Sequence, residues 1–315
     1  MQIDYCLILA AGFGTRMGEI GKSLPKVLWP IFERSLLELQ VEYAKSLGIQ
    51  KIFINLHHQK DIILDYVQNK SVFEGVTFLL EDKILDIGGG IHNLARKVGY
   101  QGNLLVLNAD QFFLMSKDFI DESAKNLKNH PALLFSFEVD PRLGYNCLKT
   151  DANHLLTEII PAKELTQTSI GMTYTGNSLV NLSALIPVEG VSSFFDSVAI
   201  YKEQKIAVKS VGDLSYWDFG TAKRYWLSMR KILETYRAHS THPFIRFLVQ
   251  ARALKTWKID LTRLSYHAKG NEVIHLGNNR DESSSSQIIS LSDRANSNII
   301  GPSIIYKEFE EKINL

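Results

Sequence analysis

Tyr5-Cys-Leu-Ile-Leu-Ala-Ala-Gly-Phe-Gly-Thr-Arg-Met17 is the stretch of sequence that decides the fold. Its first part, Tyr5 to Ala11, is a continuous apolar run, which is typical of a strand buried on both faces of a parallel sheet. Glycines follow directly at positions 12 and 14. The stretch therefore predicts a buried strand that leads into a glycine-rich loop at the carboxyl edge of a parallel sheet, where open α/β sheets bind ligands.

Strand-like and helix-like patterns alternate along the residues that follow. Ser35-Leu-Leu-Glu38 is a capping-box signature for the start of a helix, and Gly48 suits the end of that helix. Further strands are expected at 51–56, 76–80 and 103–107, with helices at 60–68 and after a glycine turn at 88–90. This alternation predicts the fold class α/β, with a Rossmann-like, mostly parallel sheet and helices on both faces.

The rhythm changes near residue 132, where strand-like pieces follow one another closely. They are expected at 132–139, 145–150, 154–160 and 174–182, before helices at 222–238 and 244–254. We therefore predict one large domain, residues 1–235, with a first half at about 1–130 and a second half at about 131–235. Residues 236–315 are a C-terminal extension with a helix and short strands. In it, 281–286 reads as a polar loop and 299–305 as one rung of a β-helix or an edge hairpin.

The composition narrows the classes of partner. The chain of 315 residues has a net charge of +1, so neither nucleic acid nor a membrane surface is expected as the main partner. The longest apolar run, Tyr5–Ala11, is too short to cross a bilayer, and no basic segment precedes an apolar stretch. We therefore expect a cytoplasmic protein. Cys6 lies in the apolar run and is expected to be a buried small hydrophobe.

Four residues in the loop predicted from Gly12 to Pro30 suit a polyphosphate. Gly12 and Gly14 can adopt backbone angles that are closed to other residues, which allows their amide groups to converge on an anion. Arg16 adds a guanidinium that grips phosphate at two points, and Lys26 adds a mobile ammonium. Together these groups predict a binding site for a triphosphate.

Two common nucleotide-binding loops do not fit this sequence. A dinucleotide fingerprint requires Gly-x-Gly-x-x-Gly, but Met17 stands at the position of the third glycine. A Walker A loop would have to use Gly21-Lys22-Ser23, but Arg16 stands where its first glycine belongs. An ordinary tight turn between a strand and a helix would explain the glycines, but neither Arg16 nor the pair Pro25-Lys26.

Leu9–Met17 followed by Pro25-Lys26 resembles the signature of the sugar-1-phosphate nucleotidyltransferase family. The resemblance covers roughly residues 3–235 and implies the nucleotide-diphospho-sugar transferase fold, with a nucleotide-binding first half and a sugar-binding second half. Within the family, Asn55–His58 and Asp86–Ile91 are most similar to N-acetylmuramate-1-phosphate uridylyltransferases and mannose-1-phosphate guanylyltransferase-like enzymes. The nucleotide-binding residues that the resemblance implies are Ala10, Ala11, Gly12, Gly14, Thr15, Arg16, Lys26, Gly88 and Gly89.

Two acids are candidate ligands for Mg²⁺. Asp110 follows the strand predicted at 103–107, so its carboxylate is expected at the carboxyl edge of the sheet, beside the glycine-rich loop. An aspartate at a strand end is, by itself, more often a cap or a turn residue. The family resemblance gives Asp110 the metal-binding role and adds Asp218, in Tyr216–Thr221, as the second ligand.

The resemblance also implies a sugar-phosphate site and a reaction. The residues similar to the sugar-side positions of the family are Gly144, Asn146, Lys163 and Asn177, although Ala-Lys-Glu stands at 162–164 where relatives have Glu-Lys-Pro. The implied reaction transfers a nucleoside monophosphate from a nucleoside triphosphate, UTP first and GTP second, to a sugar 1-phosphate. The catalytic residues would be Arg16 on the leaving pyrophosphate, Lys26 between the reacting phosphates and Asp110 on Mg²⁺.

Two other functions stay open at this point. One is nucleotidyl transfer to a phosphate that is not a sugar, such as phosphocholine, and the other is a non-catalytic paralogue that binds a nucleotide-sugar. The presence of Arg16, Lys26, Asp110 and Asp218 together favours an active enzyme. The expected partners are small-molecule substrates, with a homo-oligomer as a further option. The segment 13–24 is expected to close over the triphosphate, with Gly18 and Gly21 as flexible points.

Overall fold

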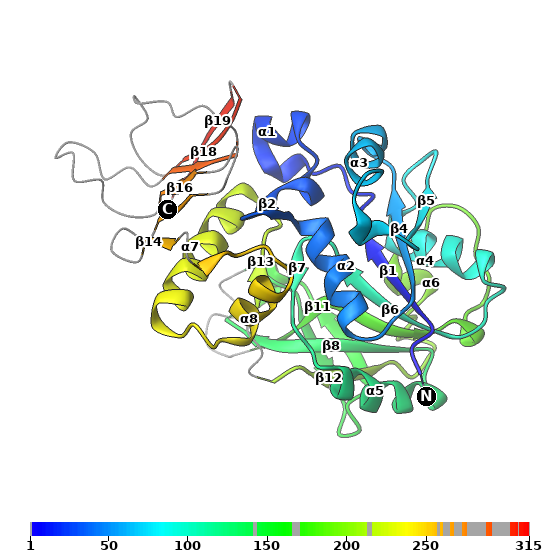
Figure 1. Cartoon of the computed structure of the whole chain (residues 1–315). Helices are drawn as coiled ribbons and strands as arrows, with labels where there is room; N and C mark the ends of the chain where they lie inside the picture. The colour runs from blue at the N-terminus through cyan, green and yellow to red at the C-terminus, as the bar shows by residue number, and fades with distance from the viewer. Residues whose placement is uncertain are drawn as a thin grey trace.

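The computed structural model (Figure 1) describes residues 2–140, 144–165, 171–212, 216–256, 259–260, 265–267, 273–275, 288–291, 303–307 and 309–314. These residues include one large mixed sheet of nine strands and a second sheet of six short strands near the C-terminus. Every helix in the described part of the chain is too short or too polar to cross a bilayer.

The parallel half of the large sheet places the glycine-rich loop. Its strands are β1 (Tyr5–Leu9), β4 (Lys51–Leu56), β5 (Thr77–Leu80) and β6 (Asn103–Asn108), in the order β5-β4-β1-β6. The helices α2 (Leu36–Ser46), α3 (Lys60–Val67) and α4 (Asp86–Lys97) connect them. The chain runs outward from β1 to β4 on one side and returns to β6 on the other, so the strand order reverses at β1. A doubly wound sheet binds ligands at this reversal, at the carboxyl ends of its strands.

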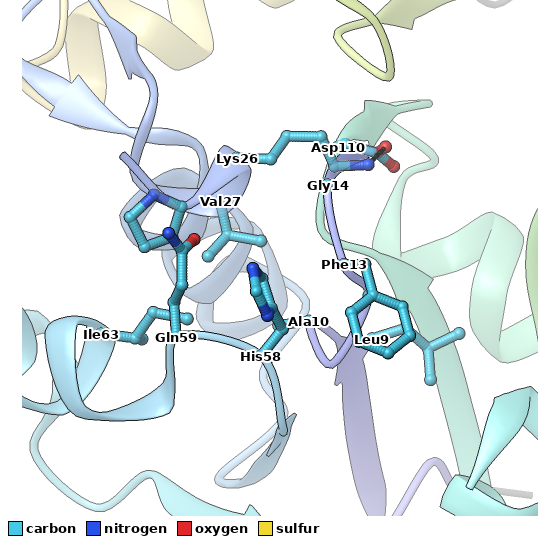
Figure 2. Close-up of a pocket in the computed structure, with 12 residues that line it drawn as sticks. Leu9, Ala10, Phe13, Gly14, Lys26, Val27, His58, Gln59, Ile63 and Asp110 are labelled. Atoms are coloured by element: carbon cyan, nitrogen blue, oxygen red, sulfur yellow. Dashed lines mark hydrogen bonds and ion pairs between the residues drawn. The ribbon is translucent and has the colours of Figure 1, made fainter. Parts of the chain in front are cut away.

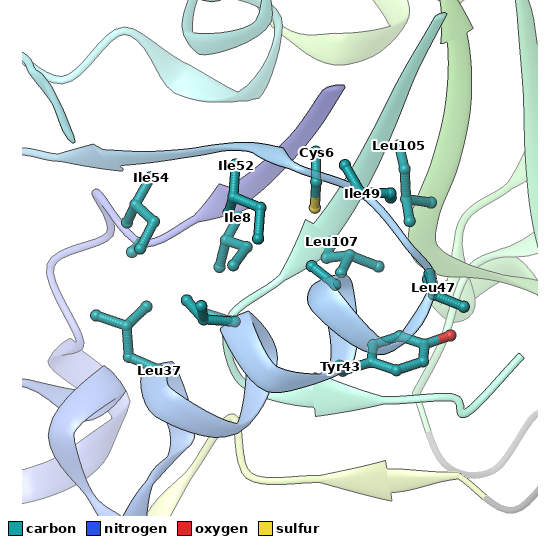
Figure 3. Packing of buried hydrophobic residues seen from close by; sticks show 14 of the residues in the cluster. Cys6, Ile8, Leu37, Tyr43, Leu47, Ile49, Ile52, Ile54, Leu105 and Leu107 are labelled. Atoms are coloured by element: carbon teal, nitrogen blue, oxygen red, sulfur yellow. The ribbon is translucent and has the colours of Figure 1, made fainter. Parts of the chain in front are cut away.

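The alternation of side chains along β1 fills both faces of the sheet. Cys6 and Ile8 face the layer formed by α2, α3 and α5 (Lys117–Asn126), as Figure 3 shows for the packing around α2. Leu7 faces the opposite layer, formed by α4 and α6 (Phe194–Ser197). Cys6 is buried and free, as predicted, and burial raises the pKa of its thiol. The predicted fold class, with helices on both faces of the sheet, is therefore confirmed.

The second half of the large sheet is mainly antiparallel. It contains β8 (Ala132–Val139), β9 (Cys147–Thr150), β10 (Leu156–Ile160), β11 (Gly171–Asn181) and β12 (Ala207–Ser210). Strand β11 pairs antiparallel with β6 and with β8, while β12 runs parallel to β8. Because β11 lies directly beside β6, the second half continues the sheet next to the strand that leads to Asp110.

A third layer packs on the segment that follows the glycine-rich loop. The pair β7 (Gln111–Phe112) and β13 (Trp217–Asp218), the helices α7 (Ala222–Ala238) and α8 (Pro243–Gln250), and the hairpin β18 (Ser303–Tyr306) and β19 (Phe309–Lys312) belong to it. Their apolar side chains share one cluster with Met17 and Ile20. The six-stranded sheet continues through β14 (Ile259–Asp260), β15 (Ser265–His267), β16 (Val273–His275) and β17 (Ile288–Ser290).

The predicted boundaries hold best where a strand or helix has a clear start or end. Strand 51–56, strand 132–139 and helix 222–238 have the predicted bounds. The capping box also forms, because the Ser35 hydroxyl accepts from the Glu38 amide while the Glu38 carboxylate accepts from the Ser35 amide. At the C-terminus β18 pairs antiparallel with β19 and parallel with β17, whereas residues 299–302 of the stretch predicted at 299–305 lie outside the described residues. The predicted polar loop 281–286 lies outside the described residues.

Two predictions about glycine segments are wrong. The stretch 12–30 is not a continuous loop, because it contains the helix α1 (Gly18–Ser23), two 3-10 turns at Thr15–Met17 and Lys26–Leu28, and the start of the short pair β2 (Pro30–Ile31) and β3 (Arg34–Ser35). Gly21 is buried in α1, where an added Cβ would lie 2.7 Å from the Met17 side chain, so it packs rather than flexes. The glycines at 88–90 lie within α4 instead of forming a turn before it.

Candidate active site

The glycine-rich loop leaves β1 through a left-handed residue. Gly14 has φ +64° and its carbonyl accepts from the amide of Met17, which starts the 3-10 turn that carries Thr15 and Arg16. Gly12 does not have a positive φ, so of the two glycines only Gly14 has a left-handed backbone. An added Cβ at Gly12 would meet nothing within 4 Å. The loop therefore turns at Gly14 and leaves open space at Gly12.

Buried polar residues fix the base of this loop. The amide of Ala10 donates to Asn55 Oδ1 (2.9 Å), and Asn55 Nδ2 donates to Glu81 Oε1 (2.8 Å). Both side chains are almost fully buried. At the tip of the loop, Phe13 packs edge-on against His57 and tilted against His58. The loop is therefore bonded to β4 and to the end of β5 before any ligand binds.

Lys26 reaches across the loop to Asp110. Its Nζ forms an ion pair with Asp110 Oδ2, and the two side chains are only 18% and 13% exposed. Lys26 starts the 3-10 turn after Pro25, whereas Asp110 follows the end of β6. Figure 2 shows the lysine side chain pointing to the carboxylate over the pocket beside Phe13 and Gly14. Two of the predicted catalytic residues therefore contact each other directly.

Gly220 marks the point at which the other predicted residues converge. A Cβ added to Gly220 would lie 3.0 Å from Asp218 Oδ1, 3.2 Å from Asp110 Oδ2 and 4.0 Å from Arg16 Nη2. The β7–β13 pair creates this arrangement, since it places Asp218 opposite Gln111, the neighbour of Asp110. Arg16, Asp110 and Asp218 thus come within 4.0 Å of the position that a side chain at Gly220 would occupy, and Lys26 joins them through its ion pair with Asp110.

Comparison with known proteins identifies the family. A family model described as nucleotidyl transferase matches residues 5–235. The chain belongs to the nucleotidyl transferase family. This result confirms the sugar-1-phosphate nucleotidyltransferase family expected from Leu9–Met17 and Pro25-Lys26.

Individual relatives match shorter parts of this nucleotidyl transferase. A bifunctional protein GlmU of Gloeothece citriformis is 33% identical over 162 residues, which are 50% of this chain and 34% of that protein. A D-glycero-α-D-manno-heptose 1-phosphate guanylyltransferase of Campylobacter jejuni is 31% identical over 107 residues, which are 34% of this chain and 48% of that protein. The chain thus spans a third to a half of the length of these curated relatives.

Solved structures confirm the fold of this nucleotidyl transferase. HddC from Yersinia pseudotuberculosis, in complex with GMP-PN, is similar with a TM-score of 0.60 at 22% identity, over 73% of this chain and 99% of that chain. A putative glucose-1-phosphate thymidylyltransferase from Bacillus anthracis is similar with a TM-score of 0.59 at 20% identity, over 71% of this chain and 93% of that chain. At these identities the similarity shows the fold alone.

The two carboxylates fit a divalent cation of the kind expected here. Mg²⁺ in proteins is usually bound by one or two carboxylates together with phosphate oxygens of the substrate. Asp110 and Asp218 supply two such carboxylates, and Gly220 leaves the space between them free of a side chain. Among the described residues, no group of three or more histidine, cysteine or acidic side chains is placed to bind a metal. The two aspartates are therefore the residues that would hold Mg²⁺ in this chain, together with phosphate oxygens.

Sequence reasoning missed the residues that hold Asp218. Asp218 Oδ2 accepts hydrogen bonds from Tyr216 Oη (2.8 Å), Tyr145 Oη (3.0 Å) and Arg224 Nη1 (2.8 Å). Burial raises the pKa of both tyrosines, and the Asp218 charge raises them further, so the hydroxyls stay protonated and donate. Arg224 lies in the first turn of α7, six residues after Asp218, which belongs to β13.

A larger cavity opens on the other side of the glycine-rich loop. It has a volume of about 310 Å³, within the size range of small-molecule sites. It shares Leu9, Gly12, Lys26 and Asp110 with the pocket of Figure 2. Its remaining lining is Ala11, Arg16, Asn55, Glu81, Ile84, Asp86, Ile87, Asn108 and Gln111. The lining of the cavity thus includes two cations, Arg16 and Lys26, and three carboxylates, from Asp110, Glu81 and Asp86.

Gly88 and Gly89 do not line this cavity. They are buried in α4, where an added Cβ would lie 2.3 Å from the Ser193 carbonyl oxygen and 2.4 Å from the Gly190 carbonyl oxygen, respectively. Their missing side chains allow α4 to pack against residues 190–193 of the same chain. Their neighbours Asp86 and Ile87, by contrast, do line the cavity.

The predicted sugar-side residues fall into two groups. Asn177 is buried beside the end of β6, where its Oδ1 accepts from the amide of Asn108 (3.1 Å). Asn146 Oδ1 accepts from the amide of Ala162 (3.0 Å), which links it to the exposed turn that carries Lys163. Gly144 is exposed, with φ +75°. Asn177 therefore lies close to the cleft, because it bonds to Asn108, which lines the cavity. Lys163 lies on the exposed turn at Ala162–Glu164.

Proposed function

We propose that this protein transfers a nucleoside monophosphate from a nucleoside triphosphate to a sugar 1-phosphate and releases pyrophosphate. The observation that supports the proposal is the convergence of Arg16, Lys26, Asp110 and Asp218 around the open position at Gly220. Two cations and two carboxylates in one cleft suit a reaction whose substrates are phosphates and a divalent cation.

The proposed step is an in-line displacement at the α-phosphorus. A phosphate oxygen of the sugar 1-phosphate forms the new P–O bond, and the bond from the α-phosphorus to the bridging oxygen breaks, with its electron pair leaving on pyrophosphate. The nucleophile is already ionised near neutral pH, so the site needs no general base. Catalysis then depends on positioning and on charge neutralisation, which agrees with the residues found.

Each charged side chain has a separate task in this proposal. Arg16 neutralises the pyrophosphate that leaves. When substrate enters, Asp110 becomes a metal ligand. The Lys26 ammonium then leaves the Asp110 carboxylate and binds the reacting phosphates. Mg²⁺, held by Asp110 and Asp218, would supply positive charge to the phosphate oxygens. The segment 13–24 is proposed to close over the triphosphate.

The base is proposed to be uracil first and guanine second. Uracil follows from the resemblance of Asn55–His58 and Asp86–Ile91. Guanine is favoured by Glu81 and Asp86, because carboxylates accept hydrogen bonds and the N1–H and N2–H₂ edge of guanine offers donors. The Campylobacter relative, which is a guanylyltransferase by name, also supports guanine. Nucleoside triphosphates are cytoplasmic metabolites, so we place the reaction in that compartment.

A pyrophosphate-release screen tests the proposal. The four common nucleoside triphosphates are combined with a panel of sugar 1-phosphates and with phosphocholine, in Mg²⁺ and with Asp110→Ala as the negative control. Release that depends on a sugar 1-phosphate and on UTP or GTP supports the proposal. Release with phosphocholine alone would move the acceptor to another class, and nucleotide binding without any release would indicate a non-catalytic protein.

A further inference from the structure

The two oxygens of Asp218 have different surroundings. Oδ2 accepts from three donors at 2.8–3.0 Å, two tyrosine hydroxyls and one guanidinium. Oδ1 accepts from the amide of Gly220 (2.7 Å) and borders the open position shared with Asp110. A carboxylate oxygen offers two lone pairs. Three donors therefore occupy Oδ2 fully, while Oδ1 keeps capacity for one more partner on the side of Asp110.

The three donors are themselves held by aromatic packing. The ring of Tyr216 stacks on Phe113, with 4.6 Å between centroids and 15° between planes. The guanidinium of Arg224 lies over the ring of Tyr145, 5.0 Å from its centroid, a contact that adds cation–π attraction. Because each donor is fixed by a second contact, the group restrains the rotation of the Asp218 carboxylate.

Helix α7 also holds the backbone of the same segment. Arg224, Ser228 and Lys231 follow one another at i, i+4 and i+7, so they share one face of the helix. Ser228 Oγ donates to the carbonyl of Asp218 (2.7 Å), and Lys231 Nζ donates to the carbonyl of Tyr216 (3.3 Å). The helix thus fixes both the main chain and the side chain of the aspartate.

We propose that Tyr145, Tyr216 and Arg224 are positioning residues. Their hydrogen bonds occupy Oδ2 of Asp218 and leave Oδ1 as its only metal-binding atom. The inference rests on the proposed function in one respect, since it takes Asp218 as a metal ligand. Groups that orient a metal ligand typically contribute about 10- to 100-fold to metal affinity or activity.

The tyrosines give a cleaner test than the arginine. Arg224 carries a positive charge beside the metal position, so its removal both loosens Asp218 and relieves repulsion of a cation. Tyr145→Phe and Tyr216→Phe each delete one hydroxyl and change no charge. Tyr43→Phe is the matched control, because Tyr43 donates its hydroxyl to the carbonyl of Met115 in the buried core, on the α2 side of the sheet.

The experiment measures binding of Mn²⁺ in the presence of inorganic pyrophosphate by the full-length chain, from the electron paramagnetic resonance signal of free Mn²⁺. We expect Tyr145→Phe and Tyr216→Phe each to weaken Mn²⁺ binding by about tenfold or more. Tyr43→Phe is expected to match the wild type, and Asp218→Asn to bind least.

Equal Mn²⁺ affinity in the wild type and in both folded tyrosine variants would overturn the inference, and so would an Asp218→Asn protein that binds like the wild type. Circular dichroism checks folding. If Tyr216→Phe does not fold, Tyr145→Phe decides, since Tyr145 is only partly buried. A wild type that binds Mn²⁺ as expected but transfers no nucleotide refutes the proposed function and leaves the positioning role intact.

Discussion

Gly220→Ala is the change that perturbs the proposed metal position most selectively. The new methyl carbon would lie 3.0 Å from Asp218 Oδ1 and 3.2 Å from Asp110 Oδ2. Contacts of this length require shifts of a few tenths of an ångström. Gly220 does not have a positive φ, so alanine brings no backbone strain. We therefore expect the fold to persist while the methyl group occupies the volume between the two carboxylates.

The expected loss of activity can be estimated from the geometry. The carboxylates need to shift by only a few tenths of an ångström, but the methyl group would displace a cation from the volume between them, and a displacement of about 1 Å costs about 10²-fold in rate, which is about 2.7 kcal/mol of transition-state stabilisation. The assay is pyrophosphate release at saturating substrates, with Mg²⁺ varied from limiting to excess. We expect kcat to fall by about this factor and the Mg²⁺ concentration for half-maximal rate to rise.

Gly75→Ala serves as the matched control, because Gly75 has φ +78° and open space around its Cβ position. Alanine there is strained by about 1–2 kcal/mol, so this variant should melt at a lower temperature and keep wild-type kcat. Gly220→Ala should show the opposite pattern. A Gly220→Ala enzyme with kcat within about threefold of the wild type, a difference of less than about 1 kcal/mol, would refute the reasoning.

Three further predictions test other parts of the account. Asp110→Ala should lower kcat by about 10²–10³ without a change in the far-ultraviolet circular dichroism spectrum, and near-normal turnover in Mg²⁺ would remove its role. Gly18→Ala should lower the melting temperature, because Gly18 has φ +65° and ψ −156°, a combination closed to alanine, and its Cβ would meet the Glu311 carboxylate at 2.0 Å; Glu311→Ala should relieve the clash but not the strain of about 1–3 kcal/mol. Burial would raise the pKa of Glu38, but the Ser35 amide and nearby cations outweigh it and lower that pKa. Its contribution to stability is therefore present above the unfolded pKa of about 4.3 and lost as the pH falls below it, so urea melts of wild type and Glu38→Gln should converge on acidification; a pH-independent gap would contradict this.

The nucleotide-binding half was largely predictable because its signals are local. Continuous apolar runs predicted β1, β4 and β6, and the rule for parallel sheets placed Asp110 beside the glycine-rich loop. Lys26 was found by its spacing from Arg16. The helix α1 was missed because glycines and a proline surround it, and its stability comes from apolar contacts with distant residues such as Ile313.

The support of Asp218 could not be read from the sequence because it depends on contacts between distant elements. Tyr145 and Asp218 are 73 positions apart in the chain and meet only in the folded structure. The predicted helix 222–238 places Arg224 and Ser228 on one face, but the sequence does not indicate that they contact Asp218. The prediction for Gly88 and Gly89 failed for a related reason. A glycine that makes room for a ligand and a glycine that makes room for another part of the chain look the same in the sequence.

The most direct test of the central claim is an anomalous-difference map from crystals grown with Mn²⁺ and pyrophosphate. The account predicts a single strong peak in the cleft, with Asp110 and Asp218 Oδ1 as its protein ligands beside Gly220, and pyrophosphate bound by Arg16 and Lys26. A peak that lies elsewhere, or a cation in the cleft that touches neither carboxylate, would contradict it.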